Sequence, residues 1–206
     1  MSDIDIISKL KNPFLYKIDY LNIQSLITDF NKIGIKNKKI NYKKSIKVSI
    51  SSDYTSNYLT EFLPIFFANK SIKADIYQKE YGSLNFISKD TKNNFWKKNN
   101  DFFVLIPSSK NLNLPLVTDK IKDIKNKAQK DSETWLRLWN SVDKKIIQTT
   151  FEPTSHPYLG EVDAVKHGGY LHYIRLVNSI LSENKPQNVH LIDIENLVFR
   201  NQKANW

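Results

Sequence analysis

The stretch "VSISSDYTSNYLTEFLPIFFANKSIKADIY", residues 48–77, contains a strand, a turn, a helix and a second strand. An apolar strand over 46–51 leads through a polar turn into a helix over 56–70. The apolar residues of this helix recur at the i, i+3, i+4, i+7, i+8 spacing of a buried stripe. A second strand is predicted over 74–77. Because a helix between two strands forms a crossover that makes them parallel, this stretch predicts an α/β fold.

The same alternation continues toward the carboxyl end of the chain. Apolar runs predict strands over 102–106, 146–150 and 188–194, and helical periodicity appears over 118–143 and 169–182. Strands that alternate with helices form a sheet covered on both faces. The predicted fold class is therefore α/β, a three-layer arrangement around a mostly parallel five-stranded sheet, with a helical extension at the amino end.

The domain organisation follows from where the strand pattern begins. We predict an N-terminal helical extension and lysine-rich linker over 1–45, and a single α/β domain over 46–206. The net charge is +10, and the segment 32–47 holds seven lysines without an acidic residue. Such a run can attract nucleic acid, anionic lipid or an acidic protein. It contains no arginine and no recognisable base-stacking motif, so we interpret it as a solvated linker and expect no nucleic-acid partner.

Several classes of site and location are disfavoured by composition. The chain has no cysteine, which rules out disulfides, thiolate metal sites and cysteine catalysis. No clustered spacing of histidines and carboxylates predicts a metal site, and we expect no cofactor. No apolar run reaches the roughly 20 residues that span a bilayer, and the start lacks a secretory pattern. We therefore expect a cytoplasmic protein without a membrane span.

A ligand crevice is expected where the parallel strands end. Ligands of such sheets bind beyond the carboxyl ends of the strands, so the loops 51–56, 78–85, 107–112 and 151–160 are predicted to border one pocket. The candidates for lining it are polar, tyrosine or glycine residues of these loops: Ser51, Ser52, Asp53, Tyr54, Gly82, Ser108, Ser109, Asn111 and His156.

Five segments carry a resemblance to a known family: residues 48–82, "DFFVLIPSSKNL" (101–112), "TTFEP" (149–153), "GGYLHYIRLVNSIL" (168–181) and "NVHLIDIENL" (188–197). Together they resemble the amino-terminal domain of FkbH-like proteins. In that family a flavodoxin-like domain related to the SGNH hydrolases precedes a haloacid-dehalogenase-type phosphatase domain of subclass IIIC. The resemblance implies a flavodoxin/SGNH-like sheet here, and a phosphatase-type domain that acts in cis or in trans.

The resemblance also implies a function. FkbH-like proteins act in polyketide and related natural-product pathways or in surface-glycan pathways. The characterised type takes a glyceryl unit from 1,3-bisphosphoglycerate, removes phosphate and loads the acyl group on an acyl carrier protein. The implied partner is thus an acyl carrier protein, or a carrier-bound or phosphorylated acyl substrate. Carrier proteins are acidic, and the positive charge of this chain suits such a partner.

A phosphatase of the implied type needs an aspartate nucleophile at the end of a strand and a second aspartate two residues later. The segment "VHLIDIENLVF" offers Asp193 and Glu195. Glu195 is longer than the expected aspartate, and Leu197 stands where a hydroxyl or small β-branched residue is expected. We interpret this segment as the last strand and its capping turn.

An SGNH hydrolase needs a serine nucleophile after the first strand and a glycine and an asparagine as oxyanion donors. Aligning the first turn places Tyr54 at the nucleophile's position. Gly82 fits the oxyanion glycine, but "PSSKN" (107–111) replaces Gly-x-Asn-Asp, and no aspartate stands three residues before a histidine. These departures indicate a degenerate or altered hydrolase site.

Three hypotheses remain open, the third being an interaction module in a surface-polysaccharide cluster. In the first, the chain is a non-catalytic or degenerate domain that binds a carrier protein or a glyceryl-type substrate. In the second, it is a stand-alone esterase or acyltransferase that uses Ser51, Ser52 or Ser56, with His156 or His167 as the base. Each serine also has a structural role open to it, either capping the helix at 56 or accepting hydrogen bonds from turn amides.

Overall fold

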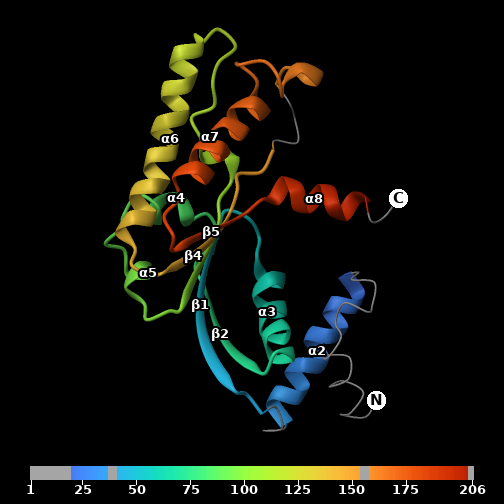
Figure 1. The fold of residues 1–206 in the computed structure, drawn as a ribbon. Helices are drawn as coiled ribbons and strands as arrows, with labels where there is room; N and C mark the ends of the chain where they lie inside the picture. Colours follow the sequence, from blue (N-terminus) through green and yellow to red (C-terminus); the bar gives the residue numbers. More distant parts are fainter. Residues whose placement is uncertain (1–19, 37–40, 154–157, 204–206) are drawn as a thin grey trace. The chain divides into compact units, whose positions relative to one another are not determined.

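The sheet has five parallel strands in the order β2-β1-β3-β4-β5. The structure, a computed structural model, describes residues 20–36, 41–153 and 158–203 (Figure 1). The strands are β1 (Lys44–Ser52), β2 (Ile72–Gln78), β3 (Phe102–Ile106), β4 (Lys145–Thr149) and β5 (Val189–Ile192). The three-layer α/β fold class predicted from the sequence is confirmed.

Helices alternate with the strands along the described chain. They are α2 (Tyr20–Lys36), α3 (Asn57–Asn69), α4 (Leu84–Ile87), α5 (Asn94–Lys97), α6 (Ile121–Ser141), α7 (Tyr170–Asn184) and α8 (Ile194–Lys203). The predicted helix over 118–143 corresponds to α6, and the one over 169–182 to α7. The one-turn helices α4 and α5 were not predicted, because four residues are too few to show a helical period.

The contacts within the chain define two compact units, and each is described by itself. The first contains the described residues up to 49 and residues 55–78, and the second contains residues 50–54 and the described residues from 79 onward. In the first unit α3 packs on β2 and α2 packs on α3 (Figure 1). Helix α3 continues past Pro64 to Asn69 and buries Ile65.

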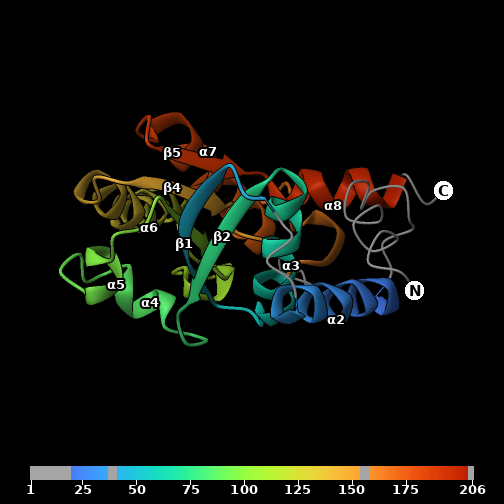
Figure 2. The same cartoon turned by 90° about the horizontal axis from the view of Figure 1, so that it is seen from below.

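The second unit contains the main hydrophobic core. Strand β4 pairs in parallel with β3 and with β5, so that Ile146 lies opposite Phe103 on one side and Val189 on the other. Helices α6 and α7 pack against each other (Figures 1 and 2). Their buried residues recur every three or four positions: Ile124, Ala128, Asp131, Ser132, Trp135, Leu138 and Trp139 on α6, and Tyr173, Ile174, Val177 and Leu181 on α7. This spacing gives each helix one apolar face.

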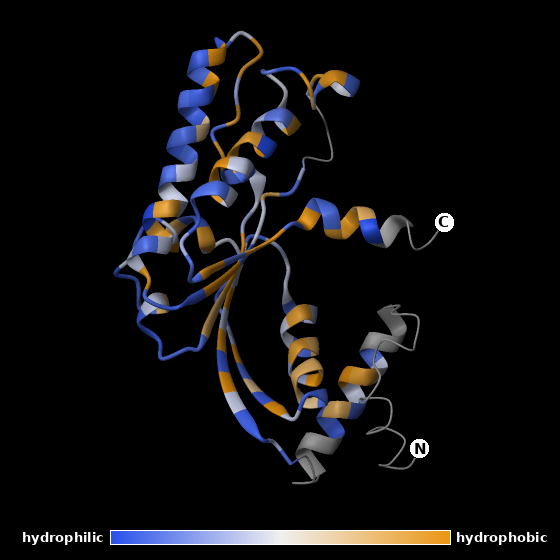
Figure 3. Cartoon of the chain, in the orientation of Figure 1, coloured by the Kyte–Doolittle hydropathy of each residue, from blue (hydrophilic) through white to orange (hydrophobic). Residues whose placement is uncertain are grey.

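Helix α6 is hydrophilic along most of its length, as Figure 3 shows, yet its buried face includes a carboxylate. Asp131 accepts hydrogen bonds from the Asn113 backbone N–H (2.8 Å), from the Asn113 side-chain amide and from the Tyr173 hydroxyl (2.7 Å). These donors compensate the loss of water around the carboxylate. Asp131 therefore ties the loop after β3 to α6 and α7.

No helix in the described part of the chain is both long enough and apolar enough to cross a bilayer.

Candidate functional site

The candidate site lies where β1 and β3 end. From β1 the chain crosses to β2 on one side, and from β3 it crosses to β4 on the other, so the neighbouring strands β1 and β3 flank the point at which the strand order reverses. Ligands of open α/β sheets bind at this point, beyond the carboxyl ends of the strands. The Asp53 N–H donates to the Ile106 carbonyl oxygen (3.0 Å) and joins the two strand ends. Every residue of the site belongs to the second unit.

Asp53 connects the turn after β1 to the loop after β3. Its Oδ2 accepts hydrogen bonds from the Ser108 backbone N–H (3.0 Å) and from Asn111 Nδ2 (2.7 Å). Ser108 and Asn111 are held in place because residues 109–111 form a short 3₁₀ turn, in which Ser108 Oγ accepts a hydrogen bond from the Lys110 N–H. The loop that the sequence places after the third strand therefore contributes donors to a carboxylate of the first turn.

Glu152 follows β4 and completes the cluster. Its Oε1 accepts from Ser109 Oγ (2.9 Å) and from Ser108 Oγ (3.2 Å), and its Oε2 accepts from the Ser109 N–H (3.1 Å). The side-chain amide of Asn178 in α7 accepts a hydrogen bond from the N–H of the adjacent Phe151 and donates one to its carbonyl oxygen, both at 2.9 Å. These bonds fix the backbone next to Glu152 relative to α7.

Sequence reasoning did not include Glu152 among the candidates. The signal was nevertheless present, because "TTFEP" places one carboxylate directly after a predicted strand and before Pro153, in a loop already expected to border the crevice. That position alone could not show that the carboxylate turns toward the serines after β3.

Tyr54 is the residue that the sequence comparison predicts at the nucleophile's position of an SGNH hydrolase. Its hydroxyl donates to Ser108 Oγ (3.2 Å), and 38% of the residue is exposed. Burial raises the pKa of Tyr54 above its ordinary value, and a hydrogen bond to Glu152 adds to the rise. The tyrosine therefore stays protonated and acts as a hydrogen-bond donor at neutral pH. The relation to the SGNH hydrolases stays a prediction.

The carboxylate of Asp53 has a perturbed pKa at this strand edge. Burial raises the pKa of Asp53 above its ordinary value. The hydrogen bond from Ser108 opposes this rise, the negative charge of Glu152 adds to it, and the hydrogen bond from Asn111 opposes it. Like charges close together disfavour the ionised form, whereas hydrogen bonds donated to a carboxylate favour it. A ligand that donates hydrogen bonds would therefore stabilise the ionised carboxylates of this site.

The remaining candidates lie near the cluster or apart from it. Ser51 is fully buried, and its hydroxyl makes no hydrogen bond in the described chain. Ser52 accepts a hydrogen bond from the Tyr54 N–H (2.9 Å), as expected of a serine that satisfies a turn amide. Gly82 has φ +73° and donates its N–H to the Ser52 carbonyl oxygen (3.3 Å). His156 lies outside the described residues.

Ser56 and His167, the other residues of the hydrolase hypothesis, make contacts elsewhere. Ser56 lies in the first unit, does not cap α3 with its side chain, and accepts from Gln78 Nε2 (2.9 Å). The ring of His167 packs edge-to-face against His172. No hydrogen bond of the described residues joins Ser51, Ser52 or Ser56 to a histidine.

The segment with Asp193 and Glu195 has a structural role. β5 ends at Ile192, and Asp193 Oδ1 accepts from the Asn196 N–H (3.0 Å) at the start of α8. Glu195 forms an ion pair with Arg175 of α7. The interpretation of this segment as a last strand with a capping turn agrees with these contacts. Among the residues the structure describes, no group of three or more histidines and carboxylates is placed to hold a metal ion.

Comparison with known proteins decides the family. The model of the family described as "FkbH, N-terminal domain" matches residues 47–205. The chain belongs to this family. A search of curated proteins finds no significant match. The FkbH N-terminal domain is similar in fold to a solved structure, the N-terminal part of a Bacteroides fragilis protein that contains a phosphatase domain complexed with Mg.

The TM-score of that match is 0.65 at 10% identity, and the match covers 82% of this chain. At this identity the likeness concerns the fold alone. The chain corresponds to only 45% of the length of the solved structure.

Proposed function

We propose that this chain is a non-catalytic binding domain of an FkbH-like protein, and that the strand-end cluster receives a glyceryl-type acyl unit carried by an acyl carrier protein. The cluster is defined as Asp53, Tyr54, Ser108, Ser109, Asn111 and Glu152. The proposal treats residues 1–45 as an extension ahead of a domain over 46–206. It assigns the chemistry to a phosphatase-type domain in cis or in trans, in natural-product or surface-glycan biosynthesis.

The observation that carries the proposal is the pairing of Asp53 and Glu152 at the point where the strand order reverses. Ionised carboxylates only accept hydrogen bonds, and hydrogen bonds to charged acceptors are stronger than neutral ones. The hydroxyl groups of a glyceryl unit would donate to such acceptors. A phosphoryl group would meet two negative charges instead, so the cluster favours an acyl unit without phosphate over a phosphorylated one.

The arrangement of the serines supports binding over hydrolysis. A serine nucleophile needs a base within hydrogen-bond reach and access to the substrate, whereas Ser51, Ser52 and Ser56 are each less than one-tenth exposed and none has a histidine partner in the described chain. Ser109 donates to a carboxylate, but it is only 1% exposed. A fluorophosphonate probe is therefore expected to leave the chain unlabelled, and labelling of a serine in the 51–56 turn would favour a stand-alone esterase or acyltransferase.

The test is calorimetric titration of the whole chain with a panel of carrier proteins, each in the holo form and loaded with a glyceryl unit, at two salt concentrations. The electrostatic part of binding to an acidic carrier should weaken with salt. The loaded carrier is expected to bind several-fold more tightly than the holo carrier, because only the loaded form can donate to Asp53 and Glu152.

Glu152→Gln and Asp123→Asn form a matched pair for this test. Both remove one carboxylate charge, but Asp123 is exposed on α6 and is not part of the cluster. The preference for the loaded carrier should be lost in Glu152→Gln and kept in Asp123→Asn. Equal affinity for loaded and holo carriers would overturn the role given to the cluster, and absence of binding to every carrier would overturn the docking role as a whole.

A further inference from the structure

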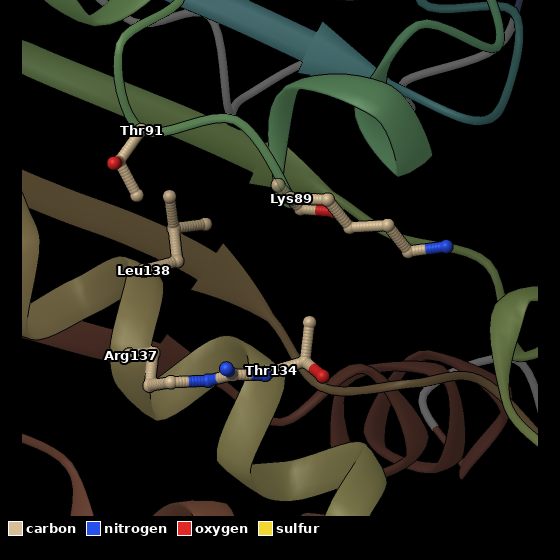
Figure 4. Close-up of a pocket in the computed structure, with 6 residues that line it drawn as sticks. Lys89, Thr91, Thr134, Arg137 and Leu138 are labelled. Atoms are coloured by element: carbon tan, nitrogen blue, oxygen red, sulfur yellow. The ribbon is translucent and has the colours of Figure 1, made fainter.

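A cavity of about 380 Å³ opens in the second unit beside α6 (Figure 4). One wall is formed by the segment that follows α4, and the other by α6 itself. The lining residues are Ser88, Lys89, Thr91, Thr134, Arg137 and Leu138. No residue of the strand-end cluster takes part. The volume lies in the range of sites that hold small organic ligands.

The charged residues that line the cavity are all cations. Lys89 comes from the segment after α4 and Arg137 from α6, and Figure 4 shows them on the two walls. Neither forms an ion pair with a carboxylate of the described residues. Arg137 also lies ahead of the last turn of α6, which contains no basic residue. Compensation of the helix dipole, which acts within the last turn, therefore does not account for it.

Arg137 and Lys89 have hydrogen-bond donors that no described residue accepts from. Arg137 uses Nε for a long contact with the Glu133 carbonyl oxygen (3.4 Å), and no hydrogen bond of its terminal amino groups to a described residue occurs. Thr134 donates to the Lys130 carbonyl oxygen at 3.3 Å, near the limit of a hydrogen bond. The Thr91 hydroxyl makes no hydrogen bond with a described residue. Guanidinium and ammonium donors on two walls of one cavity suit the oxygens of a phosphoryl group.

We propose that this cavity binds the phosphate monoester of a small organic molecule. Arg137 and Lys89 hold the phosphoryl oxygens from opposite walls. The cavity volume of about 380 Å³ leaves room for an organic part beside the phosphoryl group. The site shares no residue with the strand-end cluster and does not depend on the proposed function.

The experiment is an NMR titration of the ¹⁵N-labelled whole chain with phenyl phosphate, inorganic phosphate and phenol at low salt. Phenyl phosphate is expected to give saturable shifts at the Arg137 side-chain Nε and at backbone amides of residues 88–91 and 134–138. Inorganic phosphate should shift the same signals with weaker affinity, because it lacks an organic part. Phenol should give no saturable shift.

Single substitutions distinguish a built site from general attraction to a basic protein. Arg137→Gln and Lys89→Gln should each weaken phenyl phosphate binding about tenfold or more, the loss expected for one strong charge-assisted contact. Lys125→Gln removes the same charge from an exposed position of α6 outside the cavity and should leave the affinity unchanged. Because Arg137 and Lys89 are exposed, their replacement should not unfold the chain.

Three results would overturn the proposal. Equal weakening in Lys125→Gln would show that only net charge attracts the phosphate. Equal affinity for phenol would show that the cavity recognises the ring and not the phosphoryl group. Absence of shifts at residues 88–91 and 134–138 would place any binding elsewhere on the chain. None of these results bears on carrier binding at the strand-end cluster, so the two proposals fail separately.

Discussion

Two regions of the second unit hold carboxylates in opposite ways. Asp131 is 7% exposed and accepts three hydrogen bonds from neutral donors, without a second carboxylate among its partners. Asp53 and Glu152 are only half-buried and accept hydrogen bonds from the same short loop after β3. The negative charges of both raise the pKa of Tyr54. A carboxylate that is closed off from water stabilises the fold, whereas a partly exposed pair remains accessible to a ligand.

The largest change in the free energy of unfolding should come from replacing the buried Asp131. Asp131→Ala leaves the buried Tyr173 hydroxyl without an acceptor, which costs about 1–3 kcal/mol, and removes two hydrogen bonds from the exposed Asn113, which contribute about 0.5–1.5 kcal/mol each. We expect the free energy of unfolding to fall by about 3–4 kcal/mol, measured by urea denaturation. Asp123→Ala on the exposed face of the same helix is the control, with a change below about 1 kcal/mol. A loss below about 1 kcal/mol for Asp131→Ala would contradict the structural role.

Two tyrosines sharpen the same contrast. Tyr173 is fully buried and donates to Asp131, whereas Tyr54 is partly exposed and donates to Ser108. A hydrogen bond to a charged group contributes about 1.5–3 kcal/mol, so Tyr173→Phe should lower the free energy of unfolding by about 2 kcal/mol. Tyr54→Phe should cost less than about 1 kcal/mol, because water can replace its partner. Equal losses in urea denaturation would mean that the two regions do not differ in the way described.

Burial and crowding at the strand ends should appear in the pH dependence of stability. The pKa of Asp53 is raised in the folded chain, so the folded state binds more protons than the unfolded state between the ordinary pKa, about 3.9, and the raised one. Stability therefore falls as pH rises through this window. In Asp53→Asn this decrease should be absent, and in Asp123→Asn it should be kept.

Subtracting urea stability curves of the variant from those of the unaltered chain, from acidic to neutral pH, isolates the contribution of Asp53. Parallel curves would contradict the raised pKa. A difference of opposite sign, with the unaltered chain gaining stability as pH rises, would mean that the hydrogen bonds from Ser108 and Asn111 outweigh burial and the charge of Glu152.

The elements with a clear period could be predicted from the sequence, and the contacts between loops could not. Apolar runs such as 102–106 and the stripe of α6 repeat over enough residues to identify a strand and a helix. The rule of strand ends directed attention to Asp53, Tyr54, Ser108 and Asn111, which hydrogen bonds join in the structure. That these residues line a ligand site stays a prediction.

What escaped prediction depends on the direction of single side chains. Glu152 joins the cluster because Phe151 is anchored to Asn178 of α7, 27 residues further along the chain, and no local pattern records that contact. The cavity beside α6 escaped for a related reason. Lys89 follows a one-turn helix that has no detectable period, and its position opposite Arg137 is set by tertiary packing.

The smallest effect should come from Ser51, and it bears directly on the hydrolase hypothesis. Its hydroxyl is fully buried and makes no hydrogen bond in the described chain, and burying a polar group without a partner costs free energy. Ser51→Ala removes that group with little change in volume, so the free energy of unfolding should stay constant or rise by up to about 1 kcal/mol. In Ser52→Ala the Tyr54 N–H loses its acceptor, and a loss of about 0.5–1 kcal/mol is expected instead.

Differential urea denaturation of the two variants measures this contrast between adjacent serines. A loss above about 1 kcal/mol in Ser51→Ala would mean that its hydroxyl has a partner, and a nucleophile's hydrogen bond would then need to be considered. A neutral or stabilising result would mean that the Ser51 hydroxyl is not needed for the fold. The contacts that join the turn after β1 to the loop after β3 would then come from Asp53 and Tyr54.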